Sequence, residues 1–422
     1  MSLKNRVGNF VKKVYDKLQE KSFLEESRMR KQDFTRSRKM SFCDTMIVVL
    51  NKTGRGLTAG IRAFFEAVQI ENETYSNQAF SKGRMRIKWE AFRELFRMSV
   101  DDFYSEFKPE YYKGYRVSAI DGTKLNLPFH TETAEEFGIQ KGTNDQIQAL
   151  GSCLFDVVNK ILIDADVMNI ETSEKELAMQ HLERLSKLEH NKELIIFDRG
   201  YPSAELIEFI ENKQFKYLMR CSRSFVSPFK NLITSNDCVI SYTFKKYKYQ
   251  ANFRVIQFTL SSGETECLIT NIFDKDFLVD NFKELYHMRW CIETAYNDIK
   301  NKLELENYSG VTPLAIRQDF FATMFLRNLA SFIIIENKEE IDRLHNSGEN
   351  MHTYQANVNT VISIIKRDLI NMLVVDSKFK RRKLWKKIVT EITRSVLPVR
   401  PNRSFLRKKK HACQKFPQNQ KS

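Results

Sequence analysis

Apolar residues along the first 105 positions recur every three or four residues, the spacing that places them on one side of an α-helix. This pattern predicts a helical N-terminal domain over residues 1–105. One serine-capped helix within it carries Lys82, Arg84, Arg86 and Lys88. Such a helix is consistent with DNA reading, and equally with an ordinary amphipathic surface helix. The sequence leaves these two interpretations open.

From residue 115 the pattern changes to runs in which apolar and polar residues alternate, as they do in strands. Three such runs are followed by a helix, a short apolar strand, a second helix and a further strand. In chain order these seven elements are expected at 115–128, 147–159, 160–169, 172–190, 193–198, 202–212 and 215–222. A capping box from Ser173 to Glu176 is expected to open the first helix, and Pro202 to lie in the first turn of the second.

Strand-like runs with turn residues between them fill 222–272, which predicts an all-β insertion there. A long helix is expected over 276–306, and further helices to about residue 395. Three strands, a helix, a strand, a helix and a strand is the order of the ribonuclease-H-like fold. We therefore predict an α/β fold with a ribonuclease-H-like mixed sheet at 106–310, interrupted by the insertion, and a helical basic C-terminal region with a polar tail at 311–422.

The net charge of +15 is concentrated at the two ends of the chain. Residues 376–422 hold 16 Lys or Arg and two acids, and residues 1–40 hold 12 Lys or Arg and five acids, so the middle is mildly acidic. Basic ends around an acidic body are typical of nucleic-acid enzymes, because Lys and Arg neutralise phosphates while carboxylates hold metal. A disordered solubility tail is the alternative for the last 20 residues. The preceding segment, 378–392, has apolar residues at helical spacing, which predicts a packed helix with a cationic face.

Several classes of protein are excluded by what the sequence lacks. No uncharged apolar run is long enough to cross a bilayer, and the first residues contain no apolar signal segment. The seven cysteines form no CxxC pair, which argues against a zinc site and a disulfide framework. No GxxxxGK[ST] loop is present, so a nucleotide cofactor is not expected. We expect a cytoplasmic protein with no membrane partner.

Three acids are candidates for a catalytic centre because of their places in the predicted fold. Asp121 ends the first strand, Asp198 ends the fourth, and Glu293 lies on the long helix. Acids brought together in this way repel one another when ionised, a cost that bound divalent metal removes. Two Mg²⁺ ions, with Mn²⁺ as an alternative, fit this chemistry. An aspartate in either context, taken alone, is more often structural, as a turn residue or a helix cap. Rival acids on the second and third strands are Asp156, Asp164 and Asp166.

The long helix carries a polar stripe. Tyr286, Arg289, Glu293 and Lys300 fall within about 60° of one another on a helical projection. A stripe that holds an acid, two cations and a phenol indicates a functional face. Glu293 would bind metal there, and the two cations would bind phosphate. A chain of surface salt bridges is the alternative reading.

The same stripe carries a specific resemblance to a known family. YHMRWCIETAYNDIK at 286–300 contains the pattern Tyr-x2-Arg-x3-Glu-x6-Lys and resembles the signature of the YREK group of bacterial DDE insertion-sequence transposases. IDGT around Asp121 and DRGY around Asp198 are similar to the first and second acidic motifs of that family. The family also places an all-β insertion between the second aspartate and the glutamate.

This resemblance implies a cut-and-paste DNA transposase. Asp121, Asp198 and Glu293 would bind Mg²⁺. The residues that would hold DNA phosphates are Tyr286, Arg289 and Lys300. Trp290 would serve as an aromatic platform for a flipped base, with core packing as its alternative role.

The resemblance also implies how the protein works on DNA. It would bind the terminal inverted repeats and the target as a homodimer, form hairpin ends, and act in the bacterial cytoplasm near the nucleoid. A metal-dependent DNA nuclease and a non-catalytic DNA-binding regulator with the same fold are the alternative functions.

Overall fold

The computed structural model describes residues 5–36, 38–51, 56–70, 75–142, 145–188, 192–222, 224–226, 237–259, 263–346, 352–375 and 377–400 of the 422-residue chain. The chain divides into two compact units. The helical unit comprises Met1–Lys108, Leu125–Ala149 and Asn297–Ser422. The sheet unit comprises Pro109–Lys124 and Leu150–Tyr296. The polar C-terminal tail expected beyond residue 400 lies outside the described residues.

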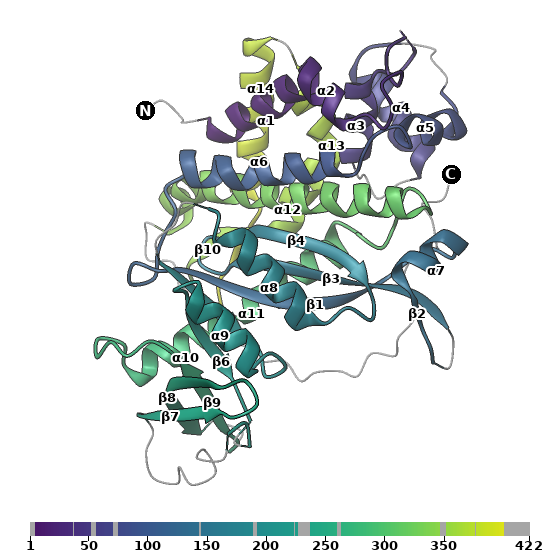
Figure 1. Cartoon of the computed structure of the whole chain (residues 1–422). Helices are drawn as coiled ribbons and strands as arrows, with labels where there is room; N and C mark the ends of the chain where they lie inside the picture. The colour runs from purple at the N-terminus through teal and green to yellow at the C-terminus, as the bar shows by residue number, and fades with distance from the viewer. Residues whose placement is uncertain are drawn as a thin grey trace. The chain divides into compact units, whose positions relative to one another are not determined.

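The sheet unit alternates strands and helices along the chain (Figure 1). Strands β1 and β3 continue from it into the helical unit. The elements are β1 (Arg116–Asn126), β3 (Gln146–Asp156), β4 (Ile161–Asn169), α8 (Glu174–Leu185), β5 (Glu193–Phe197), α9 (Ala204–Asn212), β6 (Lys216–Arg220), β7 (Asp237–Phe244), β8 (Tyr249–Thr259), β9 (Thr265–Thr270), α10 (Val279–Met288) and α11 (Trp290–Asn297). Each strand that the sequence predicts in this region is present.

The described strands form one nine-stranded mixed sheet in the order β2-β3-β1-β5-β6-β9-β8-β7, with β4 paired to β3. β1 pairs with β5 in parallel, and β5 with β6 in parallel. The first five strands of the sheet unit therefore lie in the order third, second, first, fourth, fifth, which is the ribonuclease-H-like arrangement. The predicted fold class is confirmed, including the helices at both ends of the chain.

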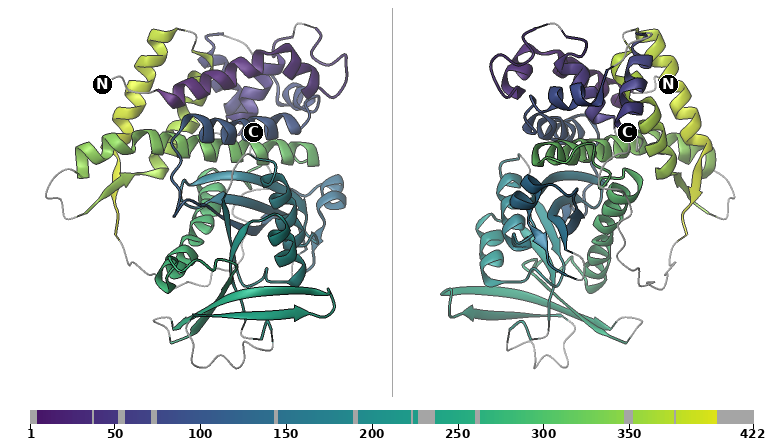
Figure 2. Two further views of the ribbon diagram at one scale, coloured as in Figure 1. Left: turned by 60° about the vertical axis from the view of Figure 1, so that its left-hand side comes forward. Right: turned by 90° about the vertical axis from the view of Figure 1, so that its right-hand side faces the viewer.

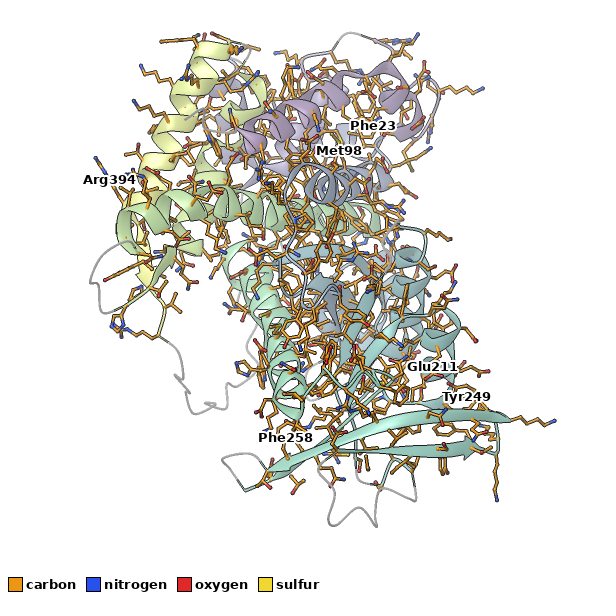
Figure 3. All side chains as sticks on the ribbon, turned by 90° about the vertical axis from the view of Figure 1, so that its left-hand side faces the viewer. Phe23, Met98, Glu211, Tyr249, Phe258 and Arg394 are labelled. Atoms are coloured by element: carbon orange, nitrogen blue, oxygen red, sulfur yellow. The ribbon has the colours of Figure 1, made fainter. Side chains whose placement is uncertain are left out.

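The all-β insertion lengthens the same sheet. β9 pairs antiparallel with β6, β8 with β9, and β7 with β8, so that β7 and β8 form a long ribbon (Figure 2). The Tyr249 hydroxyl of β8 donates a hydrogen bond to Glu211 of α9, and both side chains are labelled in Figure 3. This contact ties the ribbon to the helix layer of the sheet unit.

Helices cover both faces of the sheet (Figure 2). α8 packs on β4 and α9 on β6, while α10 and α11 lie against the opposite face. The prediction of a single helix over 276–306 is wrong in detail, because the structure divides this helix at Arg289. There the backbone makes two tight bonds, from Arg289 N–H to Tyr286 O and from Ile292 N–H to Arg289 O. A π-helix, η2 (Asp298–Lys302), then follows α11.

The helical unit contains the described helices that precede β1, those that follow α11, and α7 between β1 and β3. Short strands pair within it, β10 with β11, and β2 adds to the sheet through β3. Its elements are α1 (Arg6–Gln19), α2 (Lys21–Ser27), α3 (Phe42–Leu50), α4 (Leu57–Ala67), α5 (Asn77–Arg84), α6 (Glu90–Glu106), α7 (Thr131–Phe137), β2 (Ile139–Gln140), η2, α12 (Pro313–Ile341), η3 (Asp342–Asn346), β10 (Tyr354–Ala356), α13 (Val358–Val374), α14 (Lys378–Arg394) and β11 (Val396–Pro398).

Helix α12 is the core of the helical unit. It contacts α1, α3, α6, α13 and α14, and its middle is buried on all sides. A helix that is apolar all round is stable only where neighbours cover it. Two polar residues of this stretch are satisfied inside the unit: Arg327 pairs with Asp298 at 3.2 Å, and Asn328 donates to the Ser99 hydroxyl. Among the described helices none combines the length and the apolar character needed to cross a bilayer.

Several local predictions fail for identifiable reasons. Ser173 precedes α8 but makes no side-chain cap, so the expected capping box is absent. Pro202 lies outside α9, whose N-cap is Ser203. The serine-capped helix predicted in the N-terminal region is α5, and it ends at Arg84 rather than continuing through Lys88. The strand β10 lies in a region that the sequence predicts to be helical, and its partner β11 follows the expected end of the helices near residue 395.

Candidate active site

Asp121 and Asp198 are neighbours because of the strand register. β1 and β5 pair in parallel with Ala119 opposite Ile196, and each aspartate lies two residues further along the chain. Neighbouring strands are about 4.8 Å apart, so the register brings the two carboxyl groups to one edge of the sheet. Asp198 directly follows β5, as predicted, whereas β1 does not end at Asp121 but continues to Asn126.

Polar contacts fix the backbone at Asp121. Its carbonyl oxygen accepts hydrogen bonds from the Tyr296 hydroxyl at 2.6 Å and from the Ser152 hydroxyl at 3.4 Å. Its carboxylate accepts the N–H of Gly122 at 3.0 Å. The buried Tyr296 comes from α11, so its hydrogen bond attaches this helix directly to the strand that carries the first acid.

The carboxyl group of Asp121 resists ionisation. Burial raises its pKa from 3.8 to about 6, and the nearby guanidinium of Arg289 opposes the rise. The charges of Glu174 and Asp198 raise the pKa further. A half-buried carboxylate surrounded by other carboxylates is a site that gains from a bound cation.

Asp121→Asn is expected to stabilise the protein against unfolding at neutral pH in buffer that contains EDTA. Because the folded-state pKa of Asp121 is about 6 and the reference value is 3.8, the folded protein binds the extra proton between these pH values, and stability falls as pH rises through them. Above pH 6 the ionised group costs about 1–3 kcal/mol, which asparagine avoids. Denaturant unfolding at pH 4 and pH 7.5 should show the gain at the higher pH alone. An equal gain at both values would mean that ionisation is not its cause.

Asp198 is held by the helix on the other face of the sheet. The Tyr286 hydroxyl of α10 donates a hydrogen bond to Asp198 Oδ1 at 3.1 Å. Burial, followed by the Asp198 charge, raises the pKa of Tyr286, so the phenol stays protonated and remains a donor. Tyr286 therefore fixes the orientation of the second acid.

Arg289 links the first and third acids. Its guanidinium lies 3.0 Å from Glu293 Oε1 and 4.0 Å from Asp121 Oδ2. The side chain is 5% exposed, and its Nε has no hydrogen-bond partner among the described residues. A buried cation with unused donor capacity can bind a further oxygen anion. The tight turn at Arg289 aims this side chain toward the two acids.

The rival acids have other partners. Asp164 accepts from His181 Nδ1 at 2.8 Å and pairs with Arg184. The other ring nitrogen of His181 lies 3.0 Å from the Ser152 hydroxyl, which contacts the Asp121 carbonyl. This buried network supports the backbone at Asp121. Asp166 also pairs with Arg184, and Asp156 accepts backbone and side-chain N–H groups of the following turn.

The remaining residues of the predicted stripe differ in their surroundings. Trp290 is 47% exposed, so its side chain does not fill the core, and the Arg289 guanidinium lies 5.3 Å from its ring centre. Lys300 lies on the π-helix η2, with its amine 3.7 Å from Glu306. Burial lowers the pKa of Lys300. The change from an α-helix to a π-helix alters the angular spacing on which the stripe was predicted.

The acids of this site fit a hard divalent cation by their chemistry. Carboxylate oxygens without thiol or imidazole partners are the donors that Mg²⁺ and Mn²⁺ prefer. In the described part of the chain no three His, Cys, Asp or Glu side chains are already gathered closely enough to hold a metal. The guanidinium of Arg289 between Asp121 and Glu293 provides the positive charge that keeps these two acids close.

The sequence did not identify Glu174 and Tyr201 as part of this site. Glu174 is the first residue of α8, and its carboxylate lies against Gly122, beside Asp121. Tyr201 is in the turn that follows Asp198, where its N–H bonds to the Asp198 carbonyl. In the sequence, Glu174 is marked only by its place at the start of a helix that follows a strand of the sheet. An acid at that place is typical of helix stabilisation and does not by itself indicate a functional site.

Comparisons with known proteins place this site in a family. A comparison with curated proteins found no match. One solved structure, titled "Cryo-EM structure of piggyBac transposase synaptic complex with hairpin DNA (SNHP)", matches with a TM-score of 0.44 and 10% sequence identity, over 93% of this chain and 83% of that chain. The family described as "Transposase DDE domain" matches residues 112–329, just over half of the 422 residues and including all three candidate acids. The chain therefore belongs to the transposase DDE domain family.

Proposed function

We propose that this chain is an insertion-sequence DNA transposase of the YREK group, in which Asp121, Asp198 and Glu293 hold two Mg²⁺ or Mn²⁺ ions. The observation that carries the proposal is the register of β1 and β5, which makes the two aspartates neighbours, together with Arg289, which joins Asp121 to Glu293. These contacts lie within the matched DDE domain.

Each neighbouring side chain has a role in this proposal. Asp121, Asp198 and Glu293 would hold divalent cations, which would supply an activated oxygen nucleophile and neutralise charge on the leaving oxygen. Tyr286 orients Asp198, and Tyr296 fixes the backbone that carries Asp121. Arg289 offsets the negative charges of Asp121 and Glu293 before metal binds, and its guanidinium would hold a phosphate oxygen.

DNA contacts follow from the exposed parts of the same region. Trp290 presents an exposed indole beside Arg289, which suits stacking on a displaced base. Lys300 would hold a phosphate in exchange for its present neighbour Glu306. Burial already lowers the pKa of Lys300, and a phosphate would compensate the buried charge.

The proposed reaction is cut-and-paste transposition by a homodimer. Water nicks each element end, the freed 3′-hydroxyl forms a hairpin on the opposite strand, and the reopened end joins the target DNA. In the proposed domain organisation, residues 1–105 and 311–422 bind the terminal inverted repeats and 106–310 cuts them. The protein would act on double-stranded DNA in a bacterial cytoplasm, near the nucleoid.

Two alternative functions can be separated from this one by a single assay. Purified protein is mixed with a duplex that carries the inverted repeat flanking the gene, with Mg²⁺ or EDTA, and the products are resolved on a denaturing gel. Mg²⁺-dependent nicks at the repeat boundary with joined strands support a transposase, and a hairpin band supports the proposed pathway. Cutting without joining indicates a metal-dependent nuclease. Binding without cutting indicates a regulator.

Helix α14 provides a DNA-binding surface in this proposal. Trp385, Ile388 and Ile392 are buried, as the sequence predicts, and they attach the helix to the helical unit. Lys383, Lys386, Lys387 and Arg394 are exposed on the other side. Their spacing of three, four and eleven residues places them on one face, where they line a shallow hollow.

Replacing Lys383, Lys386 and Lys387 together by alanine is expected to weaken binding to the repeat duplex and to reduce its salt dependence. Each lysine that neutralises a phosphate contributes about 0.9 to the slope of log K against log salt, so the slope should fall by up to about 3. Fluorescence anisotropy at several salt concentrations measures this slope.

A matched control removes the same charge from lysines that already have acidic neighbours. Lys187 and Lys213 both pair with Glu183, and Lys283 pairs with Asp280; all three lie outside the segments proposed to bind the repeats. Replacing these three by alanine should leave the slope unchanged. Equal effects of the two triple variants would attribute DNA binding to net charge alone and contradict a specific surface on α14.

A further inference from the structure

A fourth carboxylate lies beside Asp121. If Gly122 carried a Cβ atom, that atom would stand 2.8 Å from Oε1 of Glu174. The Glu174 carboxylate therefore packs against the backbone of the residue that directly follows the first acid. Among the carboxylates near Asp121, the charge of Glu174 acts on it more strongly than that of Asp198. Glu174 is exposed to solvent, so an ion can reach it.

A buried hydroxyl without a partner faces the same acids. The side chain of Tyr201 is 1% exposed, and its oxygen has no hydrogen-bond partner among the described residues. Beyond burial, the charges of Glu174 and then Asp121 raise the pKa of Tyr201 most. Buried polar groups in proteins are normally satisfied. An unsatisfied phenol beside three carboxylates therefore points to a ligand oxygen or an ordered water that this group of residues is built to receive.

We propose that Glu174 is a fourth carboxylate of the metal-holding site, acting with Asp121, Asp198 and Glu293, and that Tyr201 donates a hydrogen bond to an oxygen bound in that site. This inference rests on the proposed function. Charge supports it: four carboxylates, the Arg289 guanidinium and one phosphodiester together balance two divalent cations, whereas three carboxylates leave one positive charge in excess. The carboxylate of Glu174 also occupies the space that a side chain at position 122 would need.

A structural role for Glu174 makes a different prediction. An acid in the first turn of a helix stabilises the helix through its dipole, and α8 lacks a side-chain cap at Ser173. Glu176 lies in the same first turn and is also exposed. It shares the stabilising role of Glu174 without a contact to Gly122, so Glu176→Gln is a matched control.

The test is calorimetric titration of the full chain with MnCl₂, without DNA. Glu174→Gln should weaken Mn²⁺ binding about tenfold or more, as loss of a site carboxylate does, while Glu176→Gln should stay within about twofold of the wild type. Gly122→Ala retains Glu174 but occupies the space beside its flexible carboxylate, and should reproduce the loss caused by Glu174→Gln. Circular dichroism checks that each variant is folded.

Glu293→Gln in the same titration separates this inference from the proposed function. Weaker binding in Glu293→Gln with wild-type binding in Glu174→Gln or Gly122→Ala would overturn the role of Glu174 and leave the proposed function intact. Wild-type Mn²⁺ binding in all of the variants, Glu293→Gln included, would overturn the proposed metal site itself. Tyr201→Phe removes the proposed donor to the bound oxygen and should weaken Mn²⁺ binding about tenfold, whereas wild-type affinity would overturn the role of Tyr201.

Discussion

Glu293→Gln is expected to reduce strand cleavage about a thousandfold or more, which corresponds to roughly 4 kcal/mol of lost transition-state stabilisation. Glutamine keeps the size of the side chain and can still accept a hydrogen bond from Arg289, whose guanidinium now lies 3.0 Å from the glutamate. What the substitution removes is one negative charge from the group of acids that would hold metal. Binding to the repeat duplex should remain, because the proposed DNA surface on α14 is unchanged.

Cleavage gels and anisotropy on the same preparations measure the two effects separately. Glu284→Gln is the matched control, since Glu284 lies on α10 and accepts a hydrogen bond from the Tyr112 hydroxyl at 2.7 Å. It should cut DNA as the wild type does. Cleavage at the wild-type rate by Glu293→Gln would remove this residue from the proposed catalytic centre. Loss of both cutting and binding would instead indicate a folding defect.

The strands of the sheet could be predicted from the sequence because each buried strand has an obligatory apolar pattern. The run before Asp198 is short, apolar and followed by turn residues, whereas the strand through Asp121 continues to Asn126. The strand order follows from the order of helices and strands, because parallel neighbours need a crossover connection. The adjacency of the two aspartates is a consequence of that order, and the register confirms that they lie side by side.

The helix that carries Glu293 was predicted less well. Periodicity along 276–306 treats every residue as turning by the same angle. The break at Arg289 and the π-helix η2 change this angle locally. Such irregular turns depend on tertiary contacts, here that of Arg289 with Asp121. The sequence therefore identified which residues share the region but not how each side chain is directed.

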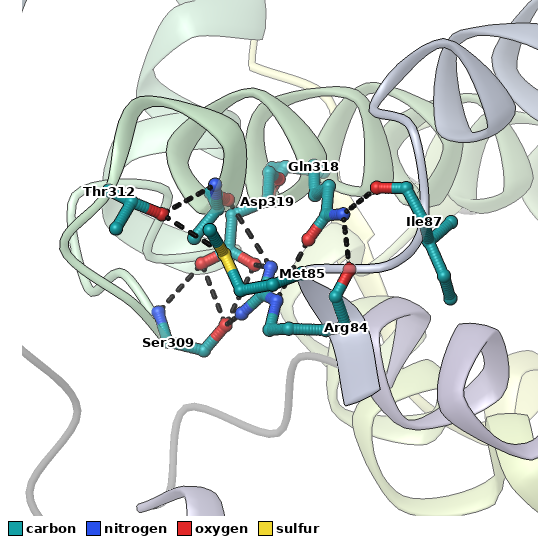
Figure 4. Close-up of polar contacts among 9 residues, drawn as sticks. Arg84, Met85, Ile87, Ser309, Thr312, Gln318 and Asp319 are labelled. Carbon is teal, nitrogen blue, oxygen red and sulfur yellow. Dashed lines mark hydrogen bonds and ion pairs between the residues drawn. The ribbon is translucent and has the colours of Figure 1, made fainter. Parts of the chain in front are cut away.

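Long-range contacts were beyond the sequence pattern altogether. Glu174 and Gly122 are separated by more than 50 residues, and neither motif indicates the other. Arg84 was one of four cations on a helix proposed to read DNA, yet the structure buries it (Figure 4). Its partner Asp319 belongs to α12, which is more than 230 residues away along the chain. A cation looks the same in a sequence whether it faces DNA or an internal acid.

The buried guanidinium of Arg84 donates hydrogen bonds to several neighbouring residues (Figure 4). It donates to Gln318 Oε1 at 2.8 Å, to the Ser309 hydroxyl at 2.5 Å, and to Asp319 Oδ1 at 3.0 Å. The Ser309 hydroxyl in turn donates to Asp319. The side chains of Arg84 and Asp319 are 2% and 0% exposed. This network connects the end of α5 to the start of α12 within the helical unit.

Arg84→Met is therefore expected to lower the free energy of unfolding by about 3–5 kcal/mol, because it leaves the carboxylate of Asp319 buried without its counter-ion. Lys82→Ala on the same helix removes an exposed cation and should change stability by less than about 0.5 kcal/mol. Denaturant unfolding measures both variants.

The double variant Arg84→Met/Asp319→Leu separates an unpaired buried charge from lost packing. If the unpaired Asp319 causes most of the loss, the double variant should unfold less readily than Arg84→Met alone, since no buried charge then remains. The recovery should be incomplete, because the N–H of Ser309 donates to Asp319 Oδ2 at 2.6 Å and would lose this acceptor. If the losses of stability caused by Arg84→Met and by Asp319→Leu simply add in the double variant, packing rather than charge holds α5 on α12. Loss of DNA binding by Arg84→Met with unchanged stability would return Arg84 to the DNA-reading role that its sequence context suggests.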